Sequence, residues 1–181
     1  MEQEHAIRWK LDTIYYHTAT INGWKHLMKE DQYKDIVISS FQHLVKNEFI
    51  RLYGYVIMPN HIHMIAEMLK KNRTEFPLGS MTKFTGHVFK ETLEKTNQYE
   101  LQYYLSDKRD RNYQFWKIRP YPFEIYSRPM MIQKLDYIHH NPVQPQWNLC
   151  NSWDEYRYSS ARFYEHGIDE FGILTHYLDY V

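Results

Sequence analysis

The sequence YGYVIMPNHIHMIAEM (residues 53–68) lies at the centre of the sheet that we expect this chain to form. Its two β-rich runs, 53–58 and 61–68, flank a Pro-Asn pair, and this pattern predicts a β-hairpin. Because side chains alternate between the two faces of a strand, His61 and His63 should project on the same face. The hairpin therefore predicts two imidazoles side by side at the beginning of its second strand.

Elements on both sides of this hairpin complete an alternating pattern. We predict strands at 12–21 and 113–126 and helices at 31–47, 79–96 and 129–140. Pro120 and Pro122 make the last strand an edge or bent strand, and Asn141-Pro142 should end the last helix. The order β-α-β-β-α-β-α predicts an α+β fold, a ferredoxin-like (split βαβ) antiparallel sheet with helices packed on one face.

The helix at 79–96 carries more detailed expectations. Ser80 or Thr82 is expected near its N-cap. Its buried stripe should consist of Phe84, Val88, Phe89 and Leu93. The polar residues 97–112 predict a loop, and a short helix is expected around 155–165.

The composition is that of one folded domain. The chain has 181 residues, of which 43% are hydrophobic and 24% charged, and we place the domain at 1–165 with a C-terminal extension at 166–181. No apolar run approaches the roughly 20 residues that span a bilayer, so we expect no membrane partner. The acidic-polar start shows no secretory signal and Cys150 is the single cysteine, which together predict a cytoplasmic protein.

Charge is balanced overall but not along the chain. Lys and Arg number 22, as do Asp and Glu, and zero net charge argues against a globally basic nucleic-acid binder. Residues 107–136, however, carry seven basic and four acidic groups, whereas 150–181 carry two basic and six acidic groups. Because Lys and Arg contacts to phosphates supply most non-specific affinity for nucleic acids, the basic segment is either a phosphate-facing strip or a solvated loop.

The His61-Ile62-His63 pattern has two interpretations. Two imidazoles on one strand face can bind a divalent metal when neighbouring elements supply the remaining ligands. An alternating pair of histidines also occurs on an ordinary polar strand face, and spacing alone favours that interpretation. The preceding Pro59-Asn60 turn strengthens the metal hypothesis, because it would hold the pair at a rigid strand edge.

A second pair lies on the helix predicted at 129–140. Tyr137 and Asn141 are four residues apart, so they share a helix face and place a phenol beside an amide oxygen. A phenol has an ordinary pKa of about 10 and is a poor nucleophile unless a metal or a base lies nearby. Without other context, core packing of Tyr137 and helix capping by Asn141 are the simpler interpretation.

Four segments together resemble the single-tyrosine HUH transposases, specifically the insertion-sequence-200-like, REP-associated tyrosine transposases. The segments are YGYVIMPNHIHMIAEM (53–68), FWKIRPYPFEIY (115–126), DYIHHNPVQ (136–144) and YRYSSA (156–161). The motif Tyr-Ile-His-x-Asn-Pro-Val begins 76 residues after the first histidine of the His-apolar-His motif. His-x-His alone is weak evidence, but the ordered set is specific and the resemblance spans about 12–165.

The resemblance implies roles for four residues. His61 and His63 match the family's HUH histidines. Asn141 matches its third metal ligand and Tyr137 its nucleophile. Family members use Mg²⁺ or Mn²⁺, whereas two imidazoles alone would suit a softer metal such as Zn²⁺ better.

The activity implied by the resemblance is DNA transposition or recombination by a metal-dependent single-stranded DNA endonuclease and strand-transferase. Such a nickase-ligase forms a 5′-phosphotyrosine intermediate and leaves a free 3′-hydroxyl. The implied partner is single-stranded DNA with a hairpin or palindromic element. Related proteins act as a monomer or a homodimer, and both remain open for this chain.

Further residues are candidates for DNA contacts. The basic and aromatic candidates are Lys108, Arg109, Arg111, Lys117, Arg119 and Trp116. Trp116 could stack an unpaired base. Lys83, His87 and Lys90 lie at helical spacing and could line a DNA groove, although a solvated helix face is the simpler interpretation. His140, three residues after Tyr137, could help orient a ligand or shuttle a proton, although packing is the simpler interpretation.

Two other functions remain open on the sequence alone. A non-catalytic single-stranded DNA- or RNA-binding module would stack bases on aromatic residues of a ferredoxin-like sheet, without metal and without a covalent product. A His-x-His phosphoesterase would act through metal-bound water and would tolerate Tyr137→Phe. The spacing of Tyr137 and Asn141 favours the transferase, because the phosphoesterase requires neither residue.

Overall fold

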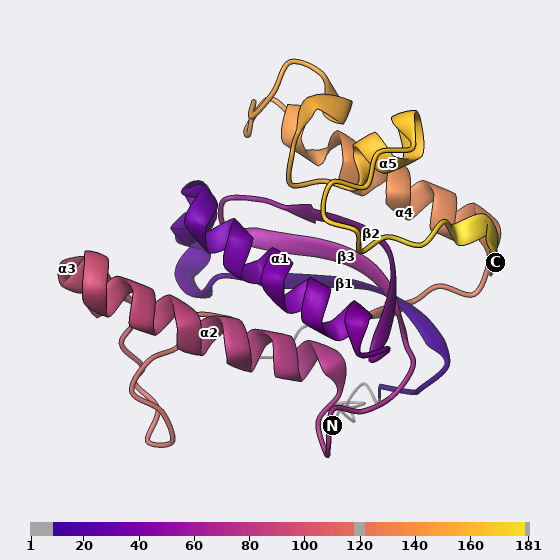
Figure 1. The fold of residues 1–181 in the computed structure, drawn as a ribbon. Helices are drawn as coiled ribbons and strands as arrows, with labels where there is room; N and C mark the ends of the chain where they lie inside the picture. The colour runs from indigo at the N-terminus through magenta and orange to yellow at the C-terminus, as the bar shows by residue number, and fades with distance from the viewer. Residues whose placement is uncertain (1–8, 118–121, 180–181) are drawn as a thin grey trace, which may run out of the picture.

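The computed structural model describes residues 9–117 and 122–179. Its centre is a four-stranded antiparallel sheet with the order β2-β3-β1-β4 (Figure 1). The strands are β1 (Thr13–Thr20), β2 (Ile50–Ile57), β3 (His61–Met68) and β4 (Phe123–Glu124). β3 lies between β1 and β2 and pairs antiparallel with both. The strands β1 and β2, which follow each other in the chain, are therefore separated in the sheet by β3, as the split βαβ prediction requires.

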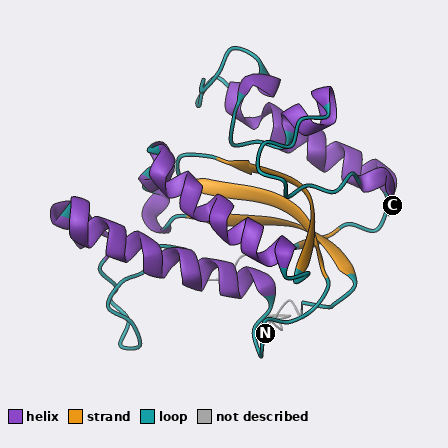
Figure 2. Cartoon of the chain, viewed as in Figure 1, coloured by secondary structure: helices purple, strands orange, loops and turns teal. Residues whose placement is uncertain are grey.

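Helices alternate with these strands and confirm the α+β class (Figure 2). The α-helices of the described residues are α1 (Asp31–Lys46), α2 (Pro77–Thr96), α3 (Gln98–Leu101), α4 (Arg128–His140) and α5 (Ala161–His166). None of these helices combines the length and the apolar character that a bilayer span requires.

Different helices cover the two faces of the sheet. The Tyr55 ring of β2 lies 5.6 Å from Phe41 of α1, and α1 packs along α2, where the Tyr33 and Phe89 rings are 5.7 Å apart. α4 lies across the opposite face (Figure 1). The prediction that helices pack on one face therefore holds for α1 and α2 and needs correction for α4.

α4 approaches the sheet at Gly54 of β2. A Cβ atom at this position would lie 2.5 Å from Cδ2 of Leu135 and 3.2 Å from Cδ1 of Ile138. Glycine allows the two buried side chains to pack directly on the strand backbone. Because one face is already covered by α1 and α2, α4 buries its apolar side chains on the other face, and this contact sets the position of Tyr137.

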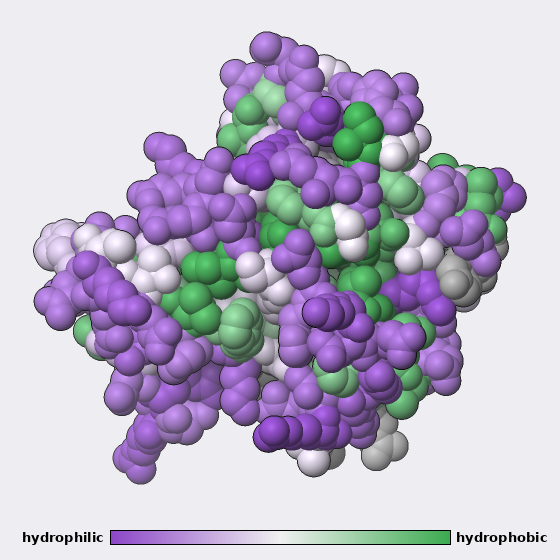
Figure 3. All heavy atoms as spheres, in the orientation of Figure 1, coloured by the Kyte–Doolittle hydropathy of each residue, from purple (hydrophilic) through white to green (hydrophobic). Residues whose placement is uncertain are grey.

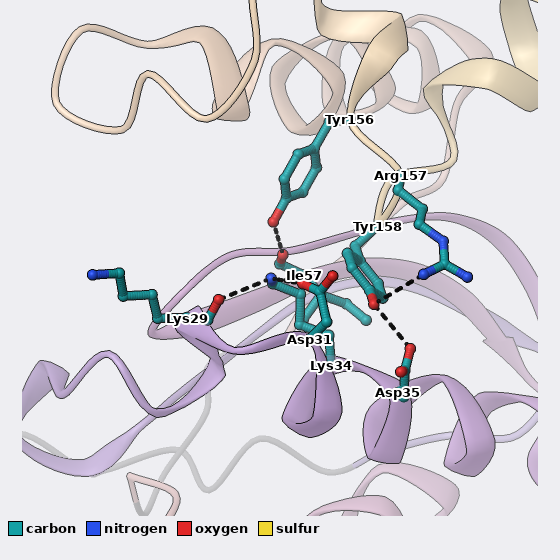
Figure 4. Close-up of polar contacts among 8 residues, drawn as sticks. All are labelled: Lys29, Asp31, Lys34, Asp35, Ile57, Tyr156, Arg157 and Tyr158. Atoms are coloured by element: carbon teal, nitrogen blue, oxygen red, sulfur yellow. Dashed lines mark hydrogen bonds and ion pairs between the residues drawn. The ribbon is translucent and has the colours of Figure 1, made fainter.

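The segment that follows α4 returns to the free edge of β2. The Ile57 N–H donates to the Tyr158 carbonyl over 2.9 Å, and the Tyr156 hydroxyl donates to the Ile57 carbonyl over 2.8 Å (Figure 4). The Tyr158 hydroxyl donates to the Asp35 carboxylate of α1 over 2.9 Å. These bonds cover an edge strand and fix its end just before the Pro59-Asn60 turn.

The C-terminal extension packs on the same domain. Ile173 is buried, and the Thr175 N–H donates to the Leu52 carbonyl of β2 over 2.9 Å. The short helix predicted at 155–165 is present as α5, and the residues before it are a 3₁₀ turn at Trp153–Glu155 and extended backbone.

α2 begins earlier than predicted. Pro77 lies in its first turn and Phe76 occupies the N-cap position, so neither Ser80 nor Thr82 caps the helix. Proline suits this place because its fixed φ fits the first turn and its missing N–H has no helical acceptor there.

The buried face of α2 also differs from the prediction. The side chains that it buries are Pro77, Leu78, Met81, Thr85, Phe89 and Leu93. Phe84 is exposed and Val88 is half-buried. Thr85 can occupy a core position because its hydroxyl donates to the Met81 carbonyl and accepts from the Trp116 indole N–H. Satisfied hydrogen bonds thus override the apolar pattern.

The chain after α2 differs from the prediction in two places. α3 and a 3₁₀ turn at Gln102–Tyr104 replace the first part of the predicted loop. Among its described residues, the strand predicted at 113–126 is reduced to β4, which pairs with β1, and to isolated bridges of Trp116 with Ile21 and of Tyr113 with Leu105. Residues 118–121, which include Pro120, lie outside the described part of the chain.

Candidate functional site

The turn between β2 and β3 holds the two histidines at a rigid edge. The backbone N–H groups of Ile21 and Met28 donate to the carbonyls of Asn60 and Pro59 over 2.8 and 2.9 Å. Both donors belong to the segment after β1, and both residues are fully buried. The turn is therefore fixed from outside the hairpin.

His61 and His63 project from the same face of β3, as predicted. Their ring centroids are 4.6 Å apart, and both side chains are buried. Thr18 is the register partner of His63 on β1, and its hydroxyl reaches the His63 ring. This face is the one that α4 covers.

Asn60 sets the orientation of His61. The Asn60 amide nitrogen donates to the Trp24 carbonyl over 3.2 Å, which turns its Oδ1 toward Nδ1 of His61 at 2.7 Å. Because that oxygen can only accept, Nδ1 carries the proton and Nε2 keeps its lone pair. This is the usual arrangement behind a metal-binding histidine. Sequence reasoning gave Asn60 only a role in the turn.

Two hydroxyl groups orient His63. The Tyr16 hydroxyl and the Thr18 hydroxyl each lie 2.8 Å from its Nδ1. The Tyr16 ring also stacks on the imidazole at 5.5 Å. Burial raises the pKa of Tyr16 to about 12, so the hydroxyl stays protonated. The alternation of β1 placed these two residues on one face, but only strand pairing put them beside His63.

Both imidazoles are electrically neutral at pH 7. Burial lowers the pKa of His61 to about 4. Burial, reinforced by the neighbouring His61, His17 and Lys134, lowers the pKa of His63 to about 3. Neither Nε2 atom has a hydrogen-bond partner among the described residues. A neutral imidazole with a free Nε2 is the form that coordinates a metal.

Tyr137 stands beside this pair from α4. Its ring lies 5.4 Å from His63 and 6.4 Å from Tyr16, edge-on to both. Its side chain is 53% exposed, so the core-packing interpretation is wrong and the phenol is open to an incoming molecule.

Asn141 completes the group at the end of α4. It is buried and lines a pocket of about 380 Å³ together with His61, His63 and Tyr137. The rest of the wall consists of Thr18, Trp24, Gln144, Gln146 and Trp147. The four residues that the resemblance implied thus meet in one chain.

The donor atoms of this pocket fit a divalent cation. The described residues hold no cluster of three His, Cys, Asp or Glu side chains. A metal here would therefore use the two imidazoles and the Asn141 amide oxygen, leaving positions for other oxygen ligands. Amide and phosphate oxygens suit Mg²⁺ and Mn²⁺, whereas imidazoles shift the preference toward softer metals.

Three further residues near the pocket were missed. Trp24 and Trp147 line it, and the Trp147 ring lies 5.5 Å from His61. Lys134 places its ammonium group 4.7 Å from the Tyr16 ring centroid. Lys134 precedes Tyr137 by three residues on the same helix face, a spacing that could have indicated it. No sequence signal indicated the tryptophans, because loops distant in sequence bring them here.

His140, the last residue of α4, packs on Trp153, in line with the simpler of its two interpretations, and its role toward a ligand stays a prediction. Its Nδ1 lies 3.0 Å from the Asp136 carbonyl and 3.2 Å from the Asp136 carboxylate. Its ring packs on Trp153 at 5.3 Å. Asn60, Tyr16 and Thr18 instead orient the histidines, because strand pairing brings them closer than the helix can bring His140.

The predicted DNA-contact residues are spread over one loop and its ends. Lys108 and Arg109 are exposed in the loop that follows α3, and Arg111 pairs with Asp110. Lys117 lies 3.8 Å over the Trp24 ring, next to the pocket. Arg119 lies outside the described residues. Trp116 is only 8% exposed, packs on Phe89 and lines a pocket between α2 and β1, so its contact with DNA stays a prediction.

Comparison with known proteins identifies this fold. One solved structure, a REP-associated tyrosine transposase bound to a REP hairpin, matches with a TM-score of 0.62 and 15% identity, over 93% of this chain and 89% of that one. A candidate transposase from Deinococcus radiodurans matches with a TM-score of 0.42 and 13% identity, over 77% of this chain and 97% of that one. No family model and no curated protein sequence matches the chain.

Proposed function

We propose that this chain is a metal-dependent single-stranded DNA endonuclease and strand-transferase that acts through Tyr137. One observation carries the proposal: an exposed phenol converges with two neutral, buried imidazoles and an amide oxygen in one pocket. A phosphoesterase that acts through metal-bound water needs no such phenol. The fold shared with a tyrosine transposase supports the same choice.

Tyr137 would act as the nucleophile. Its phenolic oxygen attacks the phosphorus of a DNA phosphodiester and loses its proton to solvent, which its exposure permits. A tyrosyl O–P bond forms, the P–O3′ bond breaks, and the departing 3′-oxygen takes up a proton. A second 3′-hydroxyl can attack the phosphotyrosine and reverse the step, so the strands are rejoined without ATP.

His61, His63 and Asn141 would hold the divalent cation, Mg²⁺ or Mn²⁺. When bound, such a cation polarises the phosphate and offsets the charge that develops during transfer. Asn60, Tyr16 and Thr18 orient the two imidazoles. The Lys134 ammonium, on the same helix as Tyr137, adds positive charge near the phosphate.

The substrate that we propose is single-stranded DNA next to a hairpin or palindromic element. The transposase that shares this fold is described with a REP hairpin. Trp24 is 56% exposed at the pocket mouth, with the Lys117 ammonium over its ring. An aromatic face beside a cation suits an unpaired base and its phosphate. All four central residues come from one chain, so we propose that Tyr137 acts in cis.

A covalent-adduct assay tests the proposed function. A single-stranded oligonucleotide with a hairpin, taken from DNA that flanks the gene, is incubated with the full chain and Mn²⁺ or Mg²⁺. We expect a protein–DNA band that survives denaturation. Tyr137→Phe should abolish this band, whereas the control Tyr99→Phe, at an exposed tyrosine of α3, should leave it unchanged. A band of equal yield in Tyr137→Phe would refute the assignment.

The structure argues against a non-catalytic module that stacks bases on the sheet. Such a module needs one broad open sheet face, and here α1 packs on β2 from one side whereas α4 packs on β2 and β3 from the other. The adduct assay separates the two functions, because binding alone leaves no band after denaturation.

A further inference from the structure

A larger pocket lies on the other side of the sheet from Tyr137. It measures about 800 Å³ and lies between α2, β1 and the segment 110–117. His17 and Ala19 of β1 line this pocket, whereas Thr18 lines the smaller one. Because successive side chains of a strand point to opposite faces, the two pockets are separated by the sheet. We call the larger one the α2 groove.

His17 is an unpartnered polar group at the base of the α2 groove. Its side chain is 1% exposed, and neither ring nitrogen has a hydrogen-bond partner among the described residues. Trp9 lies edge-on to its ring at 5.5 Å. A buried polar group without a partner is costly, so it is usually satisfied by protein, water or ligand. A neutral imidazole offers one N–H donor and one acceptor to such a ligand.

The α2 wall of this groove is open and cationic. The residues that line it are Leu78, Gly79, Thr82, Lys83, Gly86, His87 and Lys90, which, apart from Leu78, recur on one helix face. A Cβ atom at Gly79 would meet no atom within 4 Å. Glycine is less favourable than alanine inside a helix, and here its missing side chain leaves the groove wider.

The rim of the groove carries several basic side chains. Its lining residues include Lys83, Lys90, Arg111 and Lys117 and one carboxylate, Asp110, which pairs with Arg111. Lys83 and Lys90 pair with Glu75 and Glu94 over 2.8 and 2.9 Å on the exposed surface. Exposed pairs of this kind are worth little, so a phosphate can replace the carboxylates. Figure 3 shows a hydrophilic loop beneath α2 and a mixture of hydrophilic and hydrophobic residues over α2 itself.

From these observations we infer that the α2 groove binds an unpaired nucleotide of the DNA strand, with its base at His17 and its phosphate at the basic rim. The volume lies in the range of small-ligand sites. Trp9 and Tyr113, which also line the groove, offer aromatic surface to the base. The inference rests on the proposed function for its choice of DNA, and it adds a second contact that fixes which nucleotides reach Tyr137.

His17→Phe separates binding from packing. Phenylalanine keeps the ring and removes the unsatisfied nitrogens, so the free protein should be at least as stable as wild type in thermal melts. Fluorescence anisotropy with the labelled hairpin oligonucleotide, flanked by unpaired nucleotides, should nevertheless show about tenfold weaker binding. A merely structural His17 would leave the affinity unchanged. The matched control is His43→Phe, at an exposed histidine of α1.

Gly79→Leu blocks the groove without touching His17. Its side chain enters open space, so the fold should be retained while oligonucleotide binding again weakens about tenfold. Ser39→Leu, at an exposed position of α1, should bind as wild type does. If both groove variants bind the oligonucleotide as tightly as wild type, the inference is wrong.

Two further measurements locate the ligand and identify its source. An oligonucleotide with 5-iodouracil at unpaired positions should photo-crosslink to peptides that contain Trp9 or Tyr113, and crosslinks confined to Trp24 and Trp147 would overturn the inference. A mixture of free deoxynucleoside monophosphates should compete only weakly. Strong competition that His17→Phe abolishes would assign the groove to free nucleotides and overturn the choice of DNA.

The outcomes distinguish this inference from the proposed function. Loss of binding in the groove variants, with no covalent adduct in wild type, would retain the groove and refute the nuclease. A covalent adduct in wild type, with unchanged binding in both groove variants, would retain the nuclease and refute the groove.

Discussion

Asn60 accepts a hydrogen bond from Nδ1 of His61 at 2.7 Å, and this bond leaves Nε2 of the imidazole free to face the candidate site. The same amide donates to the Trp24 carbonyl. Asn60 therefore joins the histidine to the loop that carries an exposed tryptophan of the pocket wall. Asn60 thus determines the tautomer of His61 and holds the backbone of Trp24 beside it.

Asn60→Ala should weaken Mn²⁺ binding by about 10–100-fold, because the histidine loses the acceptor that fixes its tautomer. Titration calorimetry measures the affinity, and adduct yield should fall with it. Asn60→Asp keeps an acceptor and should recover part of the affinity. The control is Asn47→Ala, which removes an exposed amide that lies 3.4 Å from His43. Equal affinity in Asn60→Ala and wild type would contradict the role of Asn60.

Gly54→Ala should displace α4. The new methyl group would lie 2.5 Å from Leu135, and such overpacking typically costs about 1–3 kcal/mol of the free energy of unfolding. Because a shift of α4 moves Tyr137 away from the histidines, adduct formation should fall by more than the loss of folded protein explains. Urea unfolding and the adduct assay measure the two effects.

Gly79→Ala is the matched control for the urea measurement alone, since its methyl group meets no neighbour and alanine favours the helix by about 1 kcal/mol. This variant should be as stable as wild type or more so. Gly54→Ala with unchanged stability and full adduct yield would show that the close approach of α4 is not needed.

Acidification should destabilise the fold through His17. Burial lowers the pKa of His17 to about 4, whereas the unfolded chain titrates near the ordinary value of about 6.5. Between these values the unfolded chain binds the proton and the folded chain does not. The free energy of unfolding should therefore fall as the pH drops from about 6.5 toward 4, by up to roughly 3 kcal/mol from this residue.

His17→Phe should flatten this pH dependence in urea unfolding followed between pH 7 and 4. Part of the slope should persist, because burial also lowers the pKa values of His61, His63 and His139. Identical pH profiles in wild type and His17→Phe would show that His17 is protonated equally in both states.

Chelation by EDTA should abolish adduct formation and leave the fold intact. The protein already holds His61 and His63 through hydrogen bonds to Asn60, Tyr16 and Thr18, so the site does not need the metal to form. Thermal melts should change little, and added Mn²⁺ or Mg²⁺ should restore the adduct. Full adduct yield in EDTA would contradict the proposed metal dependence.

Much of the fold follows from local patterns. The alternation in 61–68 predicted the strand and the shared face of His61 and His63, because a strand has a period of two. The prediction for α2 was less accurate, since Thr85 takes a core place that pattern alone assigns to apolar residues such as Phe84. The hydrogen bond from Trp116, which is distant in sequence, allows Thr85 to be buried in the core.

The sequence by itself indicated the four central residues through the ordered motifs of the resemblance, because spacings of two and four residues alone show only that each pair shares a face of a strand or of a helix. Tertiary structure alone decided the rest. It placed α4 across Gly54 on the face opposite to α1 and α2, and it brought Tyr16 and Thr18 to His63. It also buried His17 at the base of a basic groove. Such contacts join segments far apart in the chain, and no local period records which strands will pair or which helix will cover them.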